Sequence, residues 1–147
     1  MRAVIQRVSR ASVSVGGEIV GGIGPGILVL LGIGRGDREE AGRWICDKLL
    51  KIRIFEDSEG RMNRNVVEAE GGILMVSQFT LYGDVGKGNR PGFDAAAPPG
   101  EAEALYDKTV GYLKSVSPVL VATGRFRAMM EVSLVNDGPV TFLLEKQ

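Results

Sequence analysis

The sequence has 147 residues, of which 44% are hydrophobic and 24% are charged. These values are ordinary for a globular protein and predict one domain, spanning residues 1–147, with a hydrophobic core of its own. Eighteen Lys and Arg residues balance eighteen Asp and Glu residues. The resulting net charge of zero argues against a protein that grips long nucleic acid through many phosphates.

Several kinds of site are excluded because the residues they need are missing. The chain has no histidine, which excludes the Ser-His-Asp triad, the Cys-His dyad and the usual zinc sites. Its one cysteine, Cys46, has no partner for an internal disulfide. No apolar run is long enough to span a bilayer, and the opening "MRAVIQRVSR" lacks the apolar stretch of a secretory signal. We therefore expect a cytoplasmic protein with no membrane contact.

The first part of the chain predicts three strands separated by tight turns. "ASVSV" (11–15) alternates as a half-buried strand does, and Gly16-Gly17 then predicts a two-residue hairpin into 18–23. A turn follows at 24–26. The run "ILVLLGI" (27–33) is short and continuously apolar, which indicates a strand buried on both faces.

Two amphipathic stretches, 37–52 and 101–116, predict helices. Asp37 with Glu40 resembles a capping box at the start of the first helix. The apolar stripe of this helix consists of Ala41, Ile45, Leu49 and Ile52. The inner face of the second is expected at Ala102, Leu105, Thr109, Tyr112 and Val116.

The remaining segments predict further strands and a long loop at 86–100, which is rich in Gly and Pro. Strands are expected at 53–56, at the apolar start of 71–84, and at 118–124, 129–135 and 139–145. The last two are expected to form a hairpin around Asp137-Gly138. Because the helices do not alternate regularly with the strands, the pattern favours an α+β fold with largely antiparallel sheets.

Three stretches that contain glycine or cysteine do not indicate a nucleotide-binding or catalytic site. "GIGRGD" (32–37) lacks the third glycine of a dinucleotide fingerprint, and Asp37 and Glu39 would repel a phosphate from the following helix. "GDVGKGN" (83–89) has no Ser or Thr after its lysine, so it is not a P-loop. Cys46 lies among core positions of a helix, as a small buried hydrophobe does.

A polar cluster follows the most apolar strand. Ser77, Gln78 and Thr80 come at the end of "GGILMV". Polar residues are ordinary where a strand leaves the core, since their side chains bond to local backbone. The alternative is a polar site that works through main-chain donors and hydroxyls, because no imidazole is available to activate a hydroxyl.

A second unusual stretch lies near the end of the chain. In "NDGPVTF" (136–142), Pro139 has no N–H to donate to a sheet. A proline at such a place indicates an edge strand, a strand start or a special site. A tight turn at Asp137-Gly138 that Pro139 stiffens is the simpler interpretation.

Together, "SQFTL" (77–81) and "NDGPVTF" (136–142) resemble the signature pair of the D-aminoacyl-tRNA deacylases. The resemblance covers nearly the whole chain, in the same order, through "MRAVIQRVSRASVSV", "GPGILVLLGI", "KIRIFEDSEGRMNRNV", "NRPGF", "AEALYD" and "TGRF". Either motif alone would be a weak signal, whereas both within matching flanks are specific. Thr80 and Val140-Thr141 look like the bacterial type of the enzyme rather than the animal type.

The resemblance implies a compact β-rich domain with two main helices packed outside. It also implies a homodimer with two active sites at the subunit interface. The implied reaction is hydrolysis of the ester that joins a D-amino acid, or mischarged glycine, to the 3′-terminal adenosine of tRNA. No metal and no organic cofactor are expected.

The resemblance also implies roles for particular residues. Ser77, Gln78, Phe79 and Thr80 would line the pocket for the terminal adenosine and the scissile ester. The element formed by Gly138, Pro139, Val140 and Thr141 resembles a cis Gly-Pro element that enters the partner's pocket and rejects L-amino acids. Arg7 would hold this element in place. Phe126 and Met130 match positions that flank the adenosine pocket.

Two positions depart from the pattern of the family: Arg127 stands where a small residue is usual, and Gly92 where Ser is frequent. Arg127 could change the pocket rim or contact a phosphate. Two other functions remain as alternatives. One is a dimer that binds the aminoacyl end of tRNA without cleaving it. The other is a general carboxylesterase, against which the absence of histidine and of a G-x-S-x-G motif argues.

Overall fold

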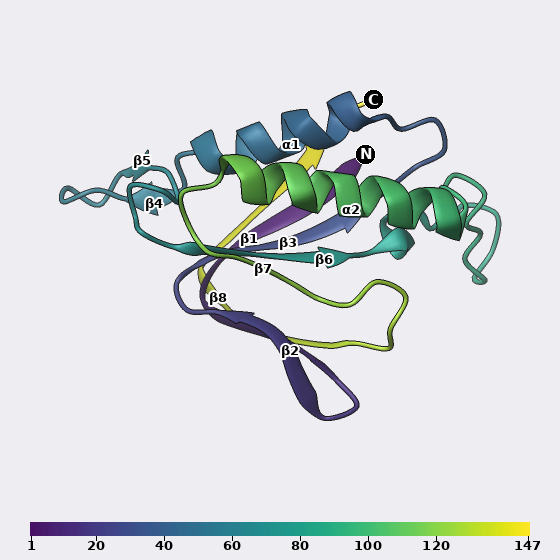
Figure 1. The fold of residues 1–147 in the computed structure, drawn as a ribbon, viewed down its shortest axis with the longest axis horizontal. Helices are drawn as coiled ribbons and strands as arrows, with labels where there is room; N and C mark the ends of the chain where they lie inside the picture. Colours follow the sequence, from purple (N-terminus) through teal and green to yellow (C-terminus); the bar gives the residue numbers. More distant parts are fainter.

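The computed structural model describes residues 1–147 as one mixed sheet, a small hairpin and two long helices (Figure 1). In chain order the elements are β1 (Arg2–Val15), β2 (Glu18–Ile23), β3 (Gly26–Gly32), α1 (Glu39–Lys51), β4 (Phe55–Glu56), β5 (Met62–Arg64), β6 (Gly72–Ser77), the 3₁₀ turn η1 (Phe79–Tyr82), α2 (Pro99–Val116), β7 (Val121–Thr123) and β8 (Glu131–Glu145). None of the helices is long and apolar enough to cross a membrane.

The main sheet is mixed, so the expectation of largely antiparallel sheets was incomplete. Its order is β2-β1-β3-β6-β7, with β8 on the other edge of β1. β1 is antiparallel to β2, β3 and β8, whereas β3 is parallel to β6 and β6 to β7. The physical reason is the position of the helices: α1 lies between β3 and β6 in the chain, and α2 between β6 and β7. Each helix therefore belongs to a crossover connection, which parallel neighbours require.

The sheet curls until its two ends nearly meet. Gly21 of β2 lies so close to Thr123 of β7 that an added Cβ would clash with the Thr123 carbonyl oxygen. Only glycine allows this approach between backbones. The result is a β-rich body that is almost closed.

Both helices cover the same face of the sheet (Figure 1). A core of 20 buried residues, including Ile5, Val29 and Met75, lies between them and the sheet. A second cluster of seven buried residues, including Leu28 and Leu74, lies on the opposite face. Successive residues along β3, and likewise along β6, thus point into different clusters. This confirms that the 27–33 run is buried on both faces.

The first helix follows its predicted stripe but not its predicted start. Ala41, Ile45 and Leu49 are buried on one face, whereas Ile52, the fourth residue of the predicted stripe, is the C-cap and is half-buried. The predicted capping box is wrong, because the N-cap is Arg38 and no side chain caps the helix. Asp37 instead accepts hydrogen bonds from Gly34 N at 2.7 Å and from the Met1 amino group. Its carboxylate therefore fixes the turn that precedes the helix.

In α2, the buried face is rotated from the predicted one. The buried residues are Ala102, Tyr106, Thr109, Val110 and Leu113, whereas Val116, the last residue of the helix, is 42% exposed. Tyr106 can lie in the core because its hydroxyl donates to Met75 O at 2.9 Å. The polar tip of the ring is thereby satisfied.

The predicted hairpin around Asp137-Gly138 is wrong. β8 is one strand, antiparallel to β1 on both sides of these residues. Gln6 pairs with Thr141 and Val8 pairs with Asn136, so four residues of β8, 137–140, stand opposite Arg7 alone. The chain does not reverse there, because β1 is long enough to pair with both halves of β8. The motif forms a large bulge.

Candidate active site

The "SQFT" residues lie where β6 leaves the sheet. Ser77 is the last residue of β6 and pairs with Leu31 of β3. Gln78 N still donates to Leu31 O at 2.8 Å, after which the chain turns into η1. This places Ser77, Gln78, Phe79 and Thr80 at the carboxyl end of a buried parallel strand, where α/β sheets commonly bind ligands.

A cavity of about 690 Å³ opens at this end of β6. Its walls come from the end of β6, from the loop before α2, from the start of α2 and from the segment between β7 and β8. The lining residues are Arg35, Val76, Ser77, Gln78, Phe79, Phe93, Ala96, Ala97, Pro98, Pro99, Ala102, Phe126, Arg127, Ala128, Met129, Met130 and Val132. The structure thus brings the first motif together with Phe126 and Met130. Thr80 is not part of the wall, but the Gln78 side-chain amide donates to its hydroxyl.

The cavity contains no side chain that could serve as a general base. Its only ionisable residues are Arg35 and Arg127, and the chain has no histidine. Tyr106 lies behind Phe126, with a ring-centroid distance of 5.5 Å. Burial raises the pKa of the Tyr106 hydroxyl far above its usual value, and this hydroxyl is engaged with Met75 O. A hydroxyl in the cavity therefore cannot be activated by proton transfer to a neighbour.

The backbone supplies the donors that the side chains do not. The N–H groups of Phe79 and Thr80 stand in the first turn of η1 and donate to no carbonyl of the chain. Gly83 N closes the turn on Thr80 O at 2.9 Å. Two adjacent free N–H groups at the start of a helical turn can hold an oxyanion.

The far wall of the cavity carries Phe126 and Met130. Met130 lies against Gly124, where an added Cβ would be 2.7 Å from the Met130 sulfur. Arg127 has a φ of 61°, which is uncommon for a residue with a side chain. Arg127, which departs from the family pattern, therefore adds an exposed cation to the cavity. Its left-handed backbone forms a turn between Phe126 and Met130.

The second motif is organised around Arg7. Arg7 is only 6% exposed, and it donates from Nε to Asp137 O at 3.0 Å and from Nη1 to Ile54 O at 2.7 Å. The peptide bond between Gly138 and Pro139 is cis, and Gly138 has a φ of 131°. At the end of the bulge, Val140 N donates to Asn136 Oδ1 at 3.0 Å.

Side chains also tie the bulge to its flanks. Val140 is buried, and Thr141 Oγ1 accepts hydrogen bonds from Asn136 Nδ2 at 3.0 Å and from Gln6 Nε2 at 3.2 Å. The bulge therefore has a defined shape although it stands outside the ladder.

Within one chain, the two motifs are not brought together. Ser77 pairs with Leu31 of β3, whose partner Ala3 of β1 pairs with Leu144 of β8. Leu144 is therefore the residue of β8 at the same level of the sheet as Ser77. Pro139 lies five residues further along β8 and three strands away from β6. At about 3.3 Å per residue and about 4.8 Å per strand, the separation along the sheet is roughly 20 Å. No residue of the bulge lines the cavity of its own chain.

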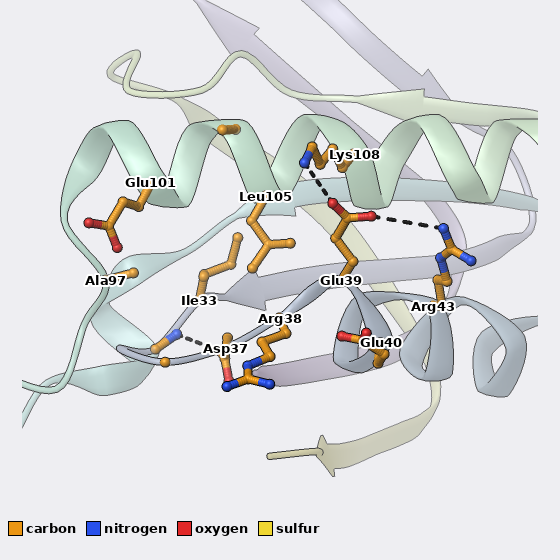
Figure 2. Close-up of a pocket in the computed structure, with 13 residues that line it drawn as sticks. Ile33, Asp37, Arg38, Glu39, Glu40, Arg43, Ala97, Glu101, Leu105 and Lys108 are labelled. Carbon is orange, nitrogen blue, oxygen red and sulfur yellow. Dashed lines mark hydrogen bonds and ion pairs between the residues drawn. The ribbon is translucent and has the colours of Figure 1, made fainter.

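Another cavity of about 700 Å³ lies between the start of α1 and α2 and contains none of the predicted site residues (Figure 2). Three of its charged side chains pair with one another: Glu39 accepts from Lys108 at 2.6 Å and lies 3.8 Å from Arg43. The hydrogen bond from Lys108 holds the pKa of Glu39 below its usual value. The cavity beside β6, which contains the predicted site residues, is therefore the candidate active site.

Sequence reasoning missed several residues of this site, among them a cation and an aromatic ring. Arg35 and Phe93 line the cavity, but Arg35 stands in a glycine-rich turn and Phe93 in a long loop. Only the "NRPGF" stretch, which is part of the family resemblance, could have indicated Phe93. No local pattern indicates Arg35.

Comparisons with known proteins show the family of the chain. A family profile described as "D-Tyr-tRNA(Tyr) deacylase" matches residues 4–145. The chain is 57% identical over 147 residues to the D-aminoacyl-tRNA deacylase of Symbiobacterium thermophilum, covering 100% of this chain and 97% of the relative. It is 56% identical over 145 residues to that of Geobacter sulfurreducens, covering 99% and 95%.

Two solved structures are also similar. One, titled "c-Myc DNA Unwinding Element Binding Protein", superposes with a TM-score of 0.94 at 44% identity, covering 100% of this chain and 99% of that one. The other is titled "Structural Analysis of a probable eukaryotic D-amino acid tRNA deacylase". It superposes with a TM-score of 0.79 at 21% identity, covering 97% of each chain, and supports the fold alone.

Proposed function

The chain belongs to the D-aminoacyl-tRNA deacylase family and is a hydrolase of that kind, and from this premise we propose its substrate and mechanism. Residues 1–147 act as a single cytoplasmic domain that cleaves the ester between a D-amino acid, or glycine, and the 3′-terminal adenosine of tRNA. The observation that carries the proposal is the cavity at the end of β6, which has no ionisable base and adjoins the turn that holds the N–H groups of Phe79 and Thr80.

The reaction runs by direct attack of water on the ester carbonyl carbon. The N–H groups of Phe79 and Thr80 stabilise the developing oxyanion, which is the main contribution of the enzyme to the barrier. A ribose hydroxyl of the terminal adenosine orients the water and relays its proton to the departing ribose oxygen. Collapse of the intermediate gives the free D-amino acid and tRNA with its terminal hydroxyl restored.

Side chains of the cavity position the substrate. Phe126 and Met130 flank the adenosine, while Ser77 and the Gln78 amide hold the polar end of the site. The Gln78–Thr80 hydrogen bond fixes the Thr80 hydroxyl beside the main-chain donors. Every donor that the mechanism requires belongs to the chain or to the substrate, so we propose no cofactor and no metal.

The active enzyme is a homodimer, in which each subunit supplies a bulge to the cavity of the other. One edge of β8 pairs with no strand of its own chain. Four apolar side chains are exposed on this strand: Leu134, Val135, Phe142 and Leu143. A long unpaired edge with exposed apolar residues is stable in water when another chain covers it. The roughly 20 Å between the motifs supports a bulge that acts on the partner.

The bulge formed by Asp137, Gly138, Pro139 and Val140 excludes L-amino acids. A discrimination of 10⁴ between mirror-image substrates requires about 5.5 kcal/mol. Attractive contacts cannot provide this for side chains of different chemistry, whereas a fixed obstacle in the L direction can. Backbone presents the same atoms to every side chain, and the contacts of Arg7 and Asn136 keep it in place. Glycine is accepted because it has no side chain to reject.

One assay separates this function from its alternatives. The purified protein is incubated with D-tyrosyl-tRNA, L-tyrosyl-tRNA and a nitrophenyl ester, and loss of each ester is followed. We expect loss of D-tyrosyl-tRNA only. Binding without hydrolysis would indicate a tRNA-binding dimer, and cleavage of the nitrophenyl ester would indicate a general esterase.

A second measurement tests the dimer. Light scattering should give twice the chain mass of 15.7 kDa. Phe142→Lys, on the unpaired strand, should give monomers that lack activity. A monomeric wild-type protein with full activity would contradict the shared site.

A further inference from the structure

Two aromatic rings stand at the mouth of the active-site cavity with their surfaces in water. Phe79 is 57% exposed and Phe93 is 37% exposed, and their ring centroids are 4.9 Å apart at a tilt of 60°. Two exposed phenylalanine rings in contact are unusual on a surface that has no binding function. The tilted arrangement leaves ring faces open for a third planar group.

The position of Phe93 is built by the fold. A Cβ on Gly83 would lie 3.1 Å from the Phe93 ring, so the ring packs directly on the backbone after η1. Asp84 and Gly92 exchange two main-chain hydrogen bonds of 2.8 Å each, which close the loop between them just before Phe93. The ring is therefore held at the base of a closed loop.

Three cations stand on the loop before Phe93 or in the lining of the cavity. Lys87 and Arg90 stand on the closed loop, and Arg35 lines the cavity beside both rings. All three are exposed, and none forms an ion pair within the chain. Arg35 is oriented by its Nε, which donates to Asp94 O at 2.6 Å.

Only two carboxylates lie on the same segment. Asp84 Oδ1 already accepts a hydrogen bond from Gly86 N at 2.8 Å, and Asp94 stands beside Phe93 in sequence. Arg127 also lines the cavity, so four cations stand against two carboxylates here although the chain as a whole is neutral.

We propose that Phe79 and Phe93, with Arg35, Lys87 and Arg90, form a binding site for the single-stranded nucleotides that precede the terminal adenosine of the tRNA. Exposed aromatic rings stack on unpaired bases, and neighbouring cations contact the phosphates, in proteins that bind single strands. The site lies at the rim of the adenosine cavity, whose lining includes Arg35, Phe79 and Phe93, and it recognises RNA shape rather than the amino acid. The inference rests on the proposed function, which places the 3′ end of the tRNA in that cavity.

The test compares two substrates that differ only in these nucleotides. D-tyrosyl-tRNA has them, whereas 3′-O-D-tyrosyl-adenosine has no preceding nucleotide and no phosphate. Phe93→Ala should lower kcat/KM for D-tyrosyl-tRNA about 10-fold, the usual effect of losing one base stack. The same variant should lower kcat/KM for D-tyrosyl-adenosine by a smaller factor, because Phe93 also lines the cavity. Phe93→Tyr should restore the rate on tRNA.

The cations are tested in the same way. Lys87→Ala with Arg90→Ala should raise KM for the tRNA substrate and leave kcat unchanged. Lys114→Ala, an exposed lysine on α2 far from the loop, serves as the matched control. Equal losses on both substrates, or no loss on tRNA in any variant, would overturn the site.

A failure of the esterase proposal is recognised separately. If the wild-type protein hydrolyses neither substrate, binding of the single-stranded RNA ACCA is measured by fluorescence anisotropy. Weaker binding by Phe93→Ala than by the wild-type protein would still support the site. Equal binding by the two proteins would refute it.

Discussion

Arg7 donates its Nε hydrogen to the main-chain carbonyl of Asp137 at 3.0 Å, at the point where β8 leaves its ladder with β1. The same guanidinium reaches Ile54 O at 2.7 Å and lies 3.6 Å from the Asp137 carboxylate. One buried cation thus ties the bulge to β1 and to the segment before β4. The shape of the bulge depends on a residue that belongs to another strand.

The first prediction concerns this buried cation. Arg7→Met keeps much of the side-chain volume but leaves the carbonyls of Ile54 and Asp137 without a donor. The bond to Ile54 O is buried, whereas the bond to Asp137 O is only partly buried. One unsatisfied buried group costs about 1–3 kcal/mol, so the variant should lose about 1–3 kcal/mol of unfolding free energy. Urea denaturation measures the loss. Arg10→Met, at an exposed position of the same strand, is the control, and a similar loss in both variants would count against the role of Arg7.

The second prediction concerns Gly138. An added Cβ would lie 2.7 Å from Val140 Cγ2 and 2.9 Å from Arg7 Nη2, and the φ of 131° is unfavourable for any other residue. Gly138→Ala should displace the bulge and reduce the preference for D- over L-tyrosyl-tRNA by at least about 10-fold, a change of about 1.4 kcal/mol. Gly111→Ala, on α2 with open space at its Cβ, should leave the preference unchanged. Intact selectivity in Gly138→Ala would mean that the bulge is not the obstacle.

The third prediction concerns Thr80. Because its hydroxyl has no base beside it, Thr80→Ala should lose no more than about 10²- to 10³-fold in kcat, as for one contact to an oxyanion. Mass spectrometry of the quenched reaction should find no aminoacyl group on the protein. A covalent ester on Thr80 would replace direct attack by water with nucleophilic catalysis.

The fourth prediction concerns salt. A neutral chain whose cations gather at the cavity mouth should contact about two to four phosphates. The slope of log affinity against log salt should then be about −1.4 to −2.8 for single-stranded contacts. Binding of deacylated tRNA at several salt concentrations measures this slope. A slope near −6 would indicate a basic surface elsewhere on the protein.

The fifth prediction concerns alkaline pH. Burial raises the pKa of the Cys46 thiol and of the Tyr82 hydroxyl to about 12, from ordinary values of 9.0 and 10.0. Above pH 9.0 the unfolded chain therefore binds fewer protons than the folded protein at these groups. Their contribution to stability is complete below pH 9.0 and is lost as the pH rises towards about 12.

Urea denaturation at pH 7.5 and 10.5 tests this dependence. The unfolding free energy of the wild-type protein should fall between the two values. In Cys46→Ala, which has no thiol to ionise, the fall should be smaller. Equal falls in the two proteins would show that Cys46 does not contribute.

The parts that could be predicted from sequence are those with a strong local signal. The apolar run at 27–33 predicted a strand buried on both faces, and the stripe of α1 at Ala41, Ile45 and Leu49 was correct. The parallel pairing of β3 with β6 could not be predicted, because it depends on the path of the chain through α1. Asp137-Gly138 looks like a turn in any local pattern, and only the length of β1 makes it a bulge.

The candidate site shows the same limit. Ser77, Gln78 and Phe79 line the cavity because a strand end brings neighbours in sequence together. Arg35 and Phe93 line it because a loop folds back from a distant part of the chain, and Arg35 N donates to Ala95 O at 2.9 Å. Contacts of this kind have no periodicity and leave no trace in a local pattern.

The pairing of β1 with β8 also constrains the order in which the chain can fold. The ladder joins Arg2 to Glu145 and Ser14 to Glu131. β1 is therefore synthesised long before β8, its partner in this ladder. Until β8 is made, β1 has an open edge, and an open edge can pair with other chains. Such long-range pairing slows folding because loop entropy is lost before the contacts form. The bulge that we propose as the chiral filter is therefore completed late, when β8 docks on both sides of Arg7.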